Sequence, residues 1–207
     1  MSKNLDLSKK TSALILAAGN STRMGSPKFM LRFDNKHTFL EKIIEGYKEF
    51  GCNEIIVVVN PSGAKILQQF RSQIIDNKYI VVNTQPESER FISIQTGLNA
   101  FNNPENVFIH PLDNPFVDSS VLESLFQNSK NSDYQVPQYM GKGGHPVLIS
   151  KNVIESIVNS GESDVSLKAF LTKFIQNRVI VNRSEILVNI NSLEEYKALF
   201  KYDSRNI

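Results

Sequence analysis

The sequence has 207 residues, of which 41% are hydrophobic and 21% are charged, a composition typical of folded globular proteins and unlike that of disordered chains. Its 23 basic and 21 acidic residues leave a formal charge of only +2, which argues against nucleic acid as a partner. The N-terminus is polar and no apolar run is long enough to span a bilayer, so we expect a cytoplasmic protein. The single cysteine, Cys52, excludes an internal disulfide, and we expect it to pack in the core.

The first part of the chain alternates between apolar runs and segments with apolar residues at helical spacing. A β-branched run such as EIIVVVN needs apolar cover on both faces, which is typical of a central parallel strand. The pattern predicts strands at 12–17, 54–60, 79–83 and 106–113, and helices at 39–50, about 62–75 and 93–101. Asp118 is expected to cap a further helix. The alternation predicts a mostly parallel sheet with helices on both faces, which binds ligands beyond the carboxyl ends of its strands.

The later part of the chain is less regular. We expect strands at 133–139 and 145–150 around a glycine loop, GKGG at 141–144, then helices near 151–159 and 165–175, and two short strands within 178–190. A closing helix follows, with Ser192 and Glu195 as its capping box. Since the chain shows no internal repeat or linker, residues 1–207 are expected to form a single domain with a core at about residues 11–202.

The stretch LILAAGNSTRMGSPK follows the first predicted strand and combines two glycines with two cations. Gly19 and Gly25 allow the backbone to turn sharply and to approach a ligand closely, so that peptide N–H groups can point at phosphate oxygens. Arg23 and Lys28 add full positive charges. The stretch therefore favours a phosphate cradle; the alternative is an ordinary strand-to-helix loop whose cations are solvated. It matches neither the dinucleotide-binding fingerprint nor the Walker A sequence.

These residues resemble the N-terminal signature of a known family, the MobA-like nucleotidyltransferases of the molybdenum cofactor type. The matching residues are Leu16, Ala17, Ala18, Gly19, Ser21, Arg23, Met24, Gly25 and Lys28. Later segments resemble further motifs in the family's order: PLDNP at 111–115, GHPV at 144–147, and NINS at 189–192 with Glu194 and Glu195. The resemblance covers about residues 12–200. It implies an α/β fold of three layers, α/β/α and Rossmann-like, of the nucleotide-diphospho-sugar transferase type, whose mostly parallel sheet contains an antiparallel strand.

In that family the first motif wraps the triphosphate of a nucleoside triphosphate. The resemblance implies that Arg23 and Lys28 stabilise the charge that develops during nucleotidyl transfer. It also implies that Asp113 is catalytic and ligates Mg²⁺, with Asn191 as a neutral second ligand. Several relatives carry an aspartate in the closing segment, so the neutral Asn189 and Asn191 weaken the attraction for the metal. The alternatives are a turn residue for Asp113 and a loop residue beside the helix cap for Asn191.

The same resemblance assigns further residues. Arg90 and Ser93 match positions that approach the nucleotide in relatives that make a cytidyl-diphospho isoprenoid precursor, although Ser93 could instead cap the helix that begins there. His145 and Lys142 are expected near the acceptor, with a structural histidine and a flexible surface turn as their alternatives. Nucleotidyl transfer to a phosphate needs no general base, because the acceptor oxygen is already ionised.

The resemblance thus predicts a Mg²⁺-dependent enzyme that transfers CMP from CTP to a phosphorylated, molybdopterin-like acceptor and releases pyrophosphate. Ala18, where the guanylyl branch usually has a second glycine, favours cytidine, whereas the asparagine tail resembles the guanylyl branch. The alternatives are guanylyl or cytidylyl transfer to a sugar phosphate or another phosphorylated small molecule, and a non-catalytic nucleotide-binding module. Nucleic acid and membranes are not expected as partners, and the sequence does not decide whether the chain forms a homodimer.

Overall fold

The computed structural model describes residues 11–19, 27–70, 72–76, 79–85 and 90–200. The described strands belong to one sheet, whose main path runs β3-β2-β1-β4-β7-β5-β6, and β8 pairs with β5. Their bounds are β1 (Thr11–Ala17), β2 (Ile55–Val59), β3 (Ile80–Val82), β4 (Asn106–Pro111), β5 (Tyr134–Tyr139), β6 (Lys142–Gly143), β7 (Val147–Ser150) and β8 (Gln176–Ile180).

The directions of these strands confirm the predicted sheet. β1 pairs in parallel with β2 and β4, and β2 pairs in parallel with β3. β7 is antiparallel to both β4 and β5, and β8 is parallel to β5, so β5 and β8 run in the same direction as the first four strands. The sheet is therefore mostly parallel and contains an antiparallel strand, β7, as the resemblance implied.

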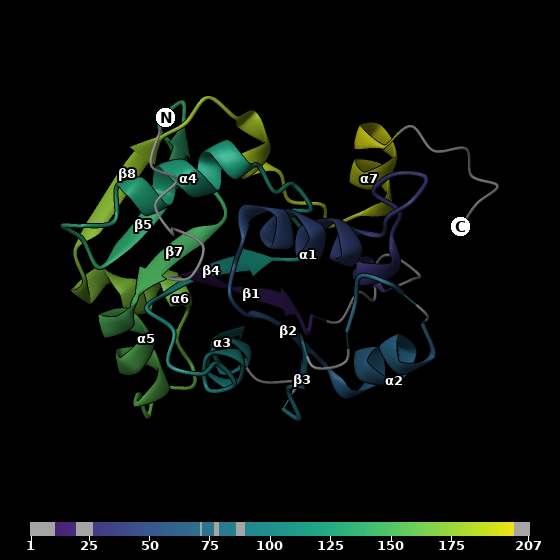
Figure 1. Ribbon diagram of the computed structural model, residues 1–207, viewed down its shortest axis with the longest axis horizontal. Helices are drawn as coiled ribbons and strands as arrows, with labels where there is room; N and C mark the ends of the chain where they lie inside the picture. The colour runs from purple at the N-terminus through teal and green to yellow at the C-terminus, as the bar shows by residue number, and fades with distance from the viewer. Residues whose placement is uncertain (1–10, 20–26, 71, 77–78, 86–89, 201–207) are drawn as a thin grey trace.

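Helices cover both faces of the sheet (Figure 1). They are α1 (Phe39–Phe50), α2 (Pro61–Gln69), α3 (Arg90–Leu98), α4 (Ser119–Gln127), α5 (Lys151–Val158), α6 (Leu167–Phe170) and α7 (Leu193–Leu199), with 3₁₀ turns at Lys28–Met30, Leu171–Lys173 and Ser184–Leu187. One apolar cluster joins the sheet to α1, α2, α4 and α7, and a second joins it to α3, α5 and α6. Every residue of β2 is buried, because this central strand is covered on both sides. The three-layer α/β/α prediction is confirmed.

Several local predictions are wrong in the later part of the chain. The helix expected at 165–175 is only the short α6 and a 3₁₀ turn, and β8 begins at Gln176. The second strand expected within 178–190 is instead the 3₁₀ turn Ser184–Leu187, after which the amide of Val188 donates to the Glu185 carbonyl, and the turn pairs with none of the described strands as a ladder. The expected GKGG loop is partly strand: Lys142–Gly143 form β6, and Met140 and Gly141 adopt φ angles of 46° and 80°. Positive φ at both central residues is what a tight two-residue hairpin requires.

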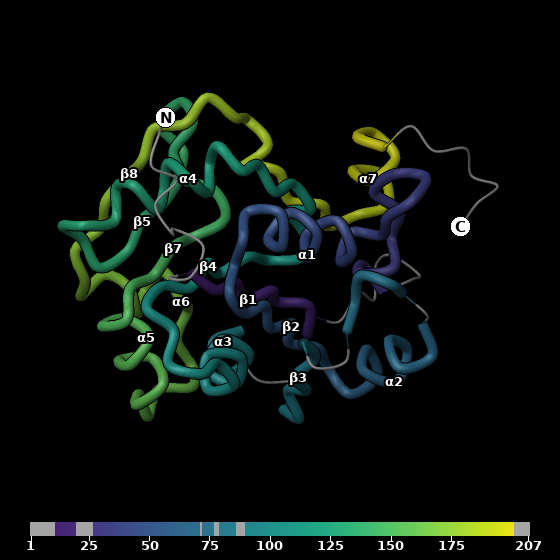
Figure 2. Tube along the Cα trace, viewed as in Figure 1, coloured from purple at the N-terminus to yellow at the C-terminus, as the bar shows by residue number. Residues whose placement is uncertain are grey.

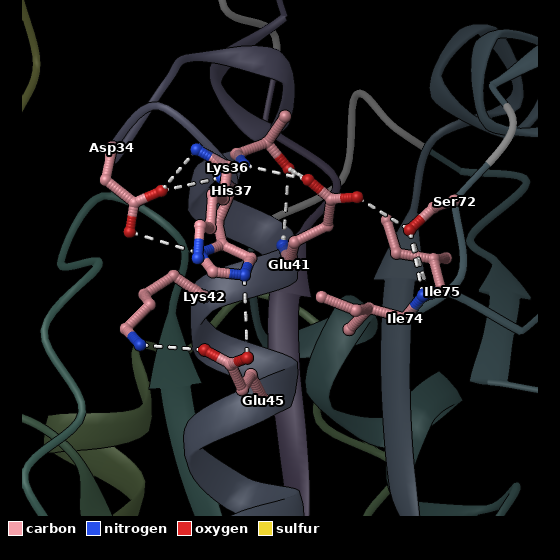
Figure 3. Close-up of polar contacts among 10 residues, drawn as sticks. Asp34, Lys36, His37, Glu41, Lys42, Glu45, Ser72, Ile74 and Ile75 are labelled. Atoms are coloured by element: carbon pink, nitrogen blue, oxygen red, sulfur yellow. Dashed lines mark hydrogen bonds and ion pairs between the residues drawn. The ribbon is translucent and has the colours of Figure 1, made fainter.

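The segment before α1 is attached to that helix by a network of polar contacts (Figure 3). Thr38 and Glu41 form a capping box at the start of α1, and Glu41 also accepts from Ser72 at 2.6 Å. Around His37, the ring Nδ1 lies 3.0 Å from Asp34 Oδ2 and the ring Nε2 lies 3.5 Å from Glu45 Oε1. Lys42 donates to Glu45 at 2.8 Å. We call Asp34, His37, Lys42 and Glu45 the His37 network.

After β8, the chain crosses the molecule to reach α7 on the opposite side (Figure 2). The crossing segment passes Asp113, because the amide of Ile190 donates to the Asp113 carbonyl at 2.8 Å. α7 then packs through Tyr196 and Phe200 against Phe33 and Phe39. α7 is thereby attached to the start of α1 and to the segment before it. Among the described residues, none of the helices has the length and hydrophobicity needed to cross a membrane.

Candidate functional site

The candidate site lies where β1 and β4 end side by side. Leu16 of β1 pairs with Pro111 of β4, and the amide of Leu112 donates to the Leu16 carbonyl at 3.1 Å. The LAAG and PLDNP segments, far apart in the sequence, therefore leave the sheet at the same edge. The chain continues from β1 to β2 on one side and returns to β4 on the other, which makes this edge a topological switch point, the usual place for a ligand in a parallel sheet.

The start of the predicted phosphate cradle is held from the neighbouring strand. Asn60, at the end of β2, caps α2 through its side-chain oxygen and donates from Nδ2 to the carbonyl of Ala18 at 3.2 Å. Gly19 is exposed, and a Cβ placed there would meet no described atom within 4 Å. Packing against the described residues therefore does not require this glycine. Ser21, Arg23 and Gly25 lie outside the described residues, so their roles stay predictions.

The first motif and the closing segment meet at Lys28. Its ammonium group donates to Asn191 Oδ1 at 2.9 Å across 163 positions of sequence. The amide of Asn191 donates to Glu195 Oε2 at 2.6 Å, beside the Ser192 capping box that starts α7. Lys28 is thus placed by a segment that the end of the chain supplies. The Asn191 side-chain oxygen contacts a cation of the protein, and its role as a metal ligand stays a prediction.

Asp113 presents a buried carboxylate oxygen at the end of β4. Its backbone carbonyl accepts from Ile190, whereas its Oδ1 has no hydrogen-bond partner among the residues that the structure describes. The following Asn114 uses both ends of its amide: Nδ2 donates to the Glu185 carbonyl at 3.0 Å and Oδ1 accepts from the amide of Phe116 at 3.1 Å. The side-chain contacts of the turn are therefore made by Asn114, and Oδ1 of Asp113 takes no part in them. A buried acceptor without a partner costs free energy, which favours a ligand role for Asp113 over a turn role.

His145 is brought to the same edge by a close approach of two segments. A Cβ at Gly144 would lie 2.3 Å from the Ile186 carbonyl oxygen, so only glycine fits before His145, whose own amide donates to that oxygen at 2.9 Å. Burial lowers the pKa of His145; the Asp113 carboxylate opposes this and the Arg90 guanidinium adds to it. His145 is therefore neutral near pH 7, and its Nδ1 is buried without a partner within the described part of the chain.

A pocket of about 590 Å³ opens beside His145 and Arg90. Its walls are mainly apolar: Leu16, Ile94, Ile109, Pro111, Tyr134, Val136, Val147, Val165, Leu167 and Leu171. Its charged lining residues are the cations Arg90, Lys168 and Arg178, and no carboxylate of the described residues lines it. Lys142 is exposed on β6 and is not a lining residue, so its contact with an acceptor stays a prediction.

Sequence reasoning missed the contribution of β8 and α6 to this pocket. β5 and β8 pair in parallel with Tyr134 opposite Gln176 and Val136 opposite Arg178, so these side chains share the pocket face of the sheet. The alternation in QNRVI, where Val179 is buried and Arg178 is exposed, was the available signal. A strand was expected from Arg178 onward, but the pairing with β5 that brings Arg178 to the pocket depends on the tertiary structure.

Ser93 does not cap its helix, because α3 begins at Arg90 and Ser93 lies inside it. Its hydroxyl is buried and accepts from Asn83 Nδ2 at 2.9 Å, which ties α3 to the end of β3. The capping alternative is therefore wrong. Contact of Ser93 with a nucleotide stays a prediction, whereas Arg90, exposed at the start of α3 and lining the pocket, stands where a ligand can reach it.

Comparison with known proteins places this arrangement among relatives of named activity. Residues 13–179 match the model of the MobA-like NTP transferase domain. The chain is 24% identical to the molybdenum cofactor cytidylyltransferase of Escherichia coli over 88% of its length and 92% of the relative's. It is 26% identical to a probable molybdenum cofactor guanylyltransferase of Methanosarcina mazei, with 95% and 92% covered. The solved structure of a nucleotidyl transferase from Methanothermobacter has a TM-score of 0.74 at 19% identity and covers 92% of this chain and 95% of that one.

Proposed function

Because the chain belongs to the MobA-like NTP transferase domain family and is a nucleotidyltransferase, we propose that it transfers CMP from CTP to a phosphorylated, molybdopterin-like acceptor. The observation that carries this proposal is the position of Asp113: a buried carboxylate oxygen without a described partner stands at the switch point, beside a pocket whose charged residues are all cations. That arrangement suits two phosphate-bearing substrates that must meet at one carboxylate.

The reaction exchanges one phosphorus–oxygen bond for another. An oxygen of the acceptor phosphate attacks the α-phosphorus of CTP, the new bond forms, and the bond to the bridging oxygen of the β-phosphate breaks as pyrophosphate leaves. Since the attacking oxygen is already ionised, the protein's task is to hold the groups and offset their charge. Lys28, placed by Asn191, and Arg23 are the residues that we propose to hold the triphosphate.

The donor set at this edge fits Mg²⁺. The described residues contain no cluster of three or more histidine, cysteine, aspartate or glutamate side chains, so a site made entirely of protein ligands is not expected there. Mg²⁺ is usually held by one or two carboxylates together with substrate phosphates, which the unpartnered oxygen of Asp113 and a bound triphosphate would provide. When bound, Mg²⁺ would offset negative charge on the triphosphate.

The pocket supports a particular class of acceptor. A sugar or polyol would leave hydroxyl groups against the apolar walls, whereas a phosphorylated molecule with an apolar or planar ring system would bury its body there and meet the cations with its charged groups. The choice of base rests on Ala18. The named relatives include both cytidylyl- and guanylyltransferases at similar identity, so GTP is the alternative donor.

The experiment that tests the proposal combines binding and turnover. We expect CTP with Mg²⁺ to raise the melting temperature of the purified protein more than ATP, GTP or UTP, because a ligand that binds only the folded state stabilises it. Pyrophosphate release should then require CTP, Mg²⁺ and molybdopterin together, with each omission as a control. A larger stabilisation by GTP than by CTP would identify GTP as the nucleotide donor in place of CTP. Binding without pyrophosphate release across phosphorylated acceptors would overturn the catalytic proposal in favour of a nucleotide-binding module.

A further inference from the structure

A second histidine, His110, lies completely buried beneath the turn that carries Asp113. It is near the end of β4, and its ring contacts two different elements. Nδ1 lies 2.8 Å from the hydroxyl of Tyr47 on α1, and Nε2 lies 2.6 Å from the backbone carbonyl oxygen of Asn114. The imidazole therefore connects α1 to the carbonyl of Asn114, the residue that follows Asp113.

The proton positions in this chain of contacts follow from the acceptors. A carbonyl oxygen can only accept, so Nε2 of His110 carries a hydrogen and donates to Asn114. Burial lowers the pKa of His110 to about 4, so the ring is neutral near pH 7 and Nδ1 has a free lone pair. Burial also raises the pKa of Tyr47, whose hydroxyl keeps its proton and donates it to Nδ1. Both ring nitrogens are thus satisfied in one tautomer.

Further tertiary contacts of the turn are made by the segment that follows β8. Asn114 reaches the Glu185 carbonyl with its side chain, and the Asp113 carbonyl accepts from Ile190. These contacts attach the turn to the segment that crosses the molecule after β8. Among the described residues, His110 supplies the side-chain contact from the core side. Asn114 is therefore held from two sides, while Oδ1 of the neighbouring Asp113 has no hydrogen-bond partner among the described residues.

The surroundings argue that His110 has more than a packing role. Val107, Phe108 and Ile109 precede it in β4 and are all buried in the apolar core. Phe108, on the same face as His110, packs against Tyr47 with ring centroids 5.7 Å apart. An apolar residue at position 110 would continue this packing but could not donate to the turn. A fully satisfied buried polar network instead holds one geometry, because any shift leaves a buried group without its partner.

We propose that His110 is a positioning residue for Asp113: as a neutral imidazole protonated on Nε2, it fixes the Asn114 peptide and thereby the direction of the Asp113 carboxylate. The ligand that Asp113 holds rests on the proposed function, whereas the positioning itself does not. Substitution of a residue that orients a metal ligand typically weakens metal binding by about 10- to 100-fold.

The two amide replacements of His110 separate positioning from packing. Glutamine places its amide nitrogen near the position of Nε2, so His110→Gln keeps the donor to Asn114 and loses the acceptor for Tyr47. Asparagine reaches only the position of Nδ1, so His110→Asn keeps a partner for Tyr47 and loses the contact with Asn114. Both variants introduce an amide into the same site, which makes each the matched control of the other.

The first readout is amide hydrogen exchange of Leu112, Asn114 and Phe116, whose N–H groups are bonded within the turn or to its neighbours. We expect exchange to accelerate about tenfold in His110→Asn and to stay near the wild-type rate in His110→Gln. The second readout is Mn²⁺ affinity in the presence of CTP, expected to fall about tenfold or more in His110→Asn only. Equal effects of the two variants, scaling with their loss of stability, would overturn the proposal.

Two measurements keep the test decisive. If His110→Asn does not fold, the ¹⁵N NMR spectrum of the histidine rings in the wild type tests the proposal. The proposal requires a neutral His110 ring with its proton on Nε2. A proton on Nδ1 would exclude the hydrogen bond to Asn114 and overturn the proposal. If the wild type binds Mn²⁺ with none of the four nucleoside triphosphates, the proposed function fails. The exchange rates of the variants then decide the positioning proposal by themselves.

Discussion

The His37 network and the edge around Asp113 both contain polar side chains, but only in the His37 network do these side chains bind one another. In the His37 network, Asp34 and Glu45 both face His37, and Lys42 also pairs with Glu45 (Figure 3). At the switch point, an oxygen of Asp113 and a nitrogen of His145 are buried without a partner among the described residues.

The pKa shifts also differ between the two regions. Burial opposes ionisation of Asp34, but hydrogen bonds from His37 and Lys36 outweigh it and lower its pKa. The hydrogen bond from Lys42 lowers the pKa of Glu45. At the switch point, burial lowers the pKa of His145 and keeps the ring uncharged. The His37 network therefore stabilises its own charges, whereas the switch point holds groups whose partners must come from outside the described structure. Polar groups of the second kind indicate function.

The largest effect expected from this comparison is on catalysis. Asp113→Asn keeps the shape of the side chain and removes its charge, so we expect turnover to fall by about 10³-fold, equivalent to about 4 kcal/mol of transition-state stabilisation. The melting temperature should stay the same or rise, because a buried charge without a described partner is removed. Steady-state kinetics and thermal unfolding measure the two effects, and Glu45→Gln is the control. A variant that loses stability but keeps turnover would contradict the assignment.

The next effect concerns pH and belongs to the buried His110. Its folded-state pKa is about 4, below the value near 6.5 of an unfolded chain, so the unfolded state binds the proton first as the pH falls. The stability of the wild type should therefore decrease between pH 6.5 and 4, by about 3 kcal/mol from this group. His110→Gln does not titrate and should lack this part of the decrease. Denaturant unfolding at several pH values compares the two chains, and parallel curves would show that His110 is not buried as a neutral ring.

A smaller effect is expected in the pocket. Arg178→Gln removes a cation at the β8 wall, so we expect the KM of the anionic acceptor to rise about tenfold while the KM of CTP changes little. Lys173→Gln is the matched control, since Lys173 is an exposed cation nearby that lies over the Phe170 ring and does not line this pocket. Initial-rate kinetics with each substrate varied in turn measure both constants. A tenfold rise in the KM of CTP instead would show that Arg178 contacts the nucleotide rather than the acceptor.

The smallest effect is expected in the His37 network itself. Glu45→Gln breaks an ion pair between partly exposed side chains, and such pairs contribute about 0.5 kcal/mol to stability at low salt. We expect a slightly lower melting temperature, a difference that shrinks at high salt, and turnover within about twofold of wild type. Thermal unfolding at low and high salt provides the measurement. Loss of turnover would show that the segment before α1 takes part in catalysis.

Much of the fold could be predicted because its signals are local. The all-buried run of β2 and the apolar spacing of α1 each describe one element, and neither depends on distant contacts. Between Leu167 and Leu187, the strand expected from Arg178 matches part of β8, whereas the length of the preceding helix and the second strand were wrong. The elements of this region are short, and their form depends on neighbouring segments. Ile186, for example, lies in the 3₁₀ turn Ser184–Leu187, and its carbonyl accepts from the amide of His145, a residue distant in the sequence.

The candidate site shows the same limit. The sequence singled out Asp113, His145 and Lys28, and the structure brings the first two to the edge where β1 and β4 end. The sequence could not indicate that Lys28 contacts Asn191, nor that Arg178 of β8 lines the pocket, because both depend on how segments far apart in the chain are aligned.

The sequence by itself determined the alternation of strands and helices, the family and the chemical types of the residues at the switch point, because periodicity and motif spacing are properties of neighbouring residues. Only the tertiary structure decided which of those residues have partners. Among the described residues, Oδ1 of Asp113 has no partner while both ring nitrogens of His110 have one, and that difference arises from burial and from the register of distant segments.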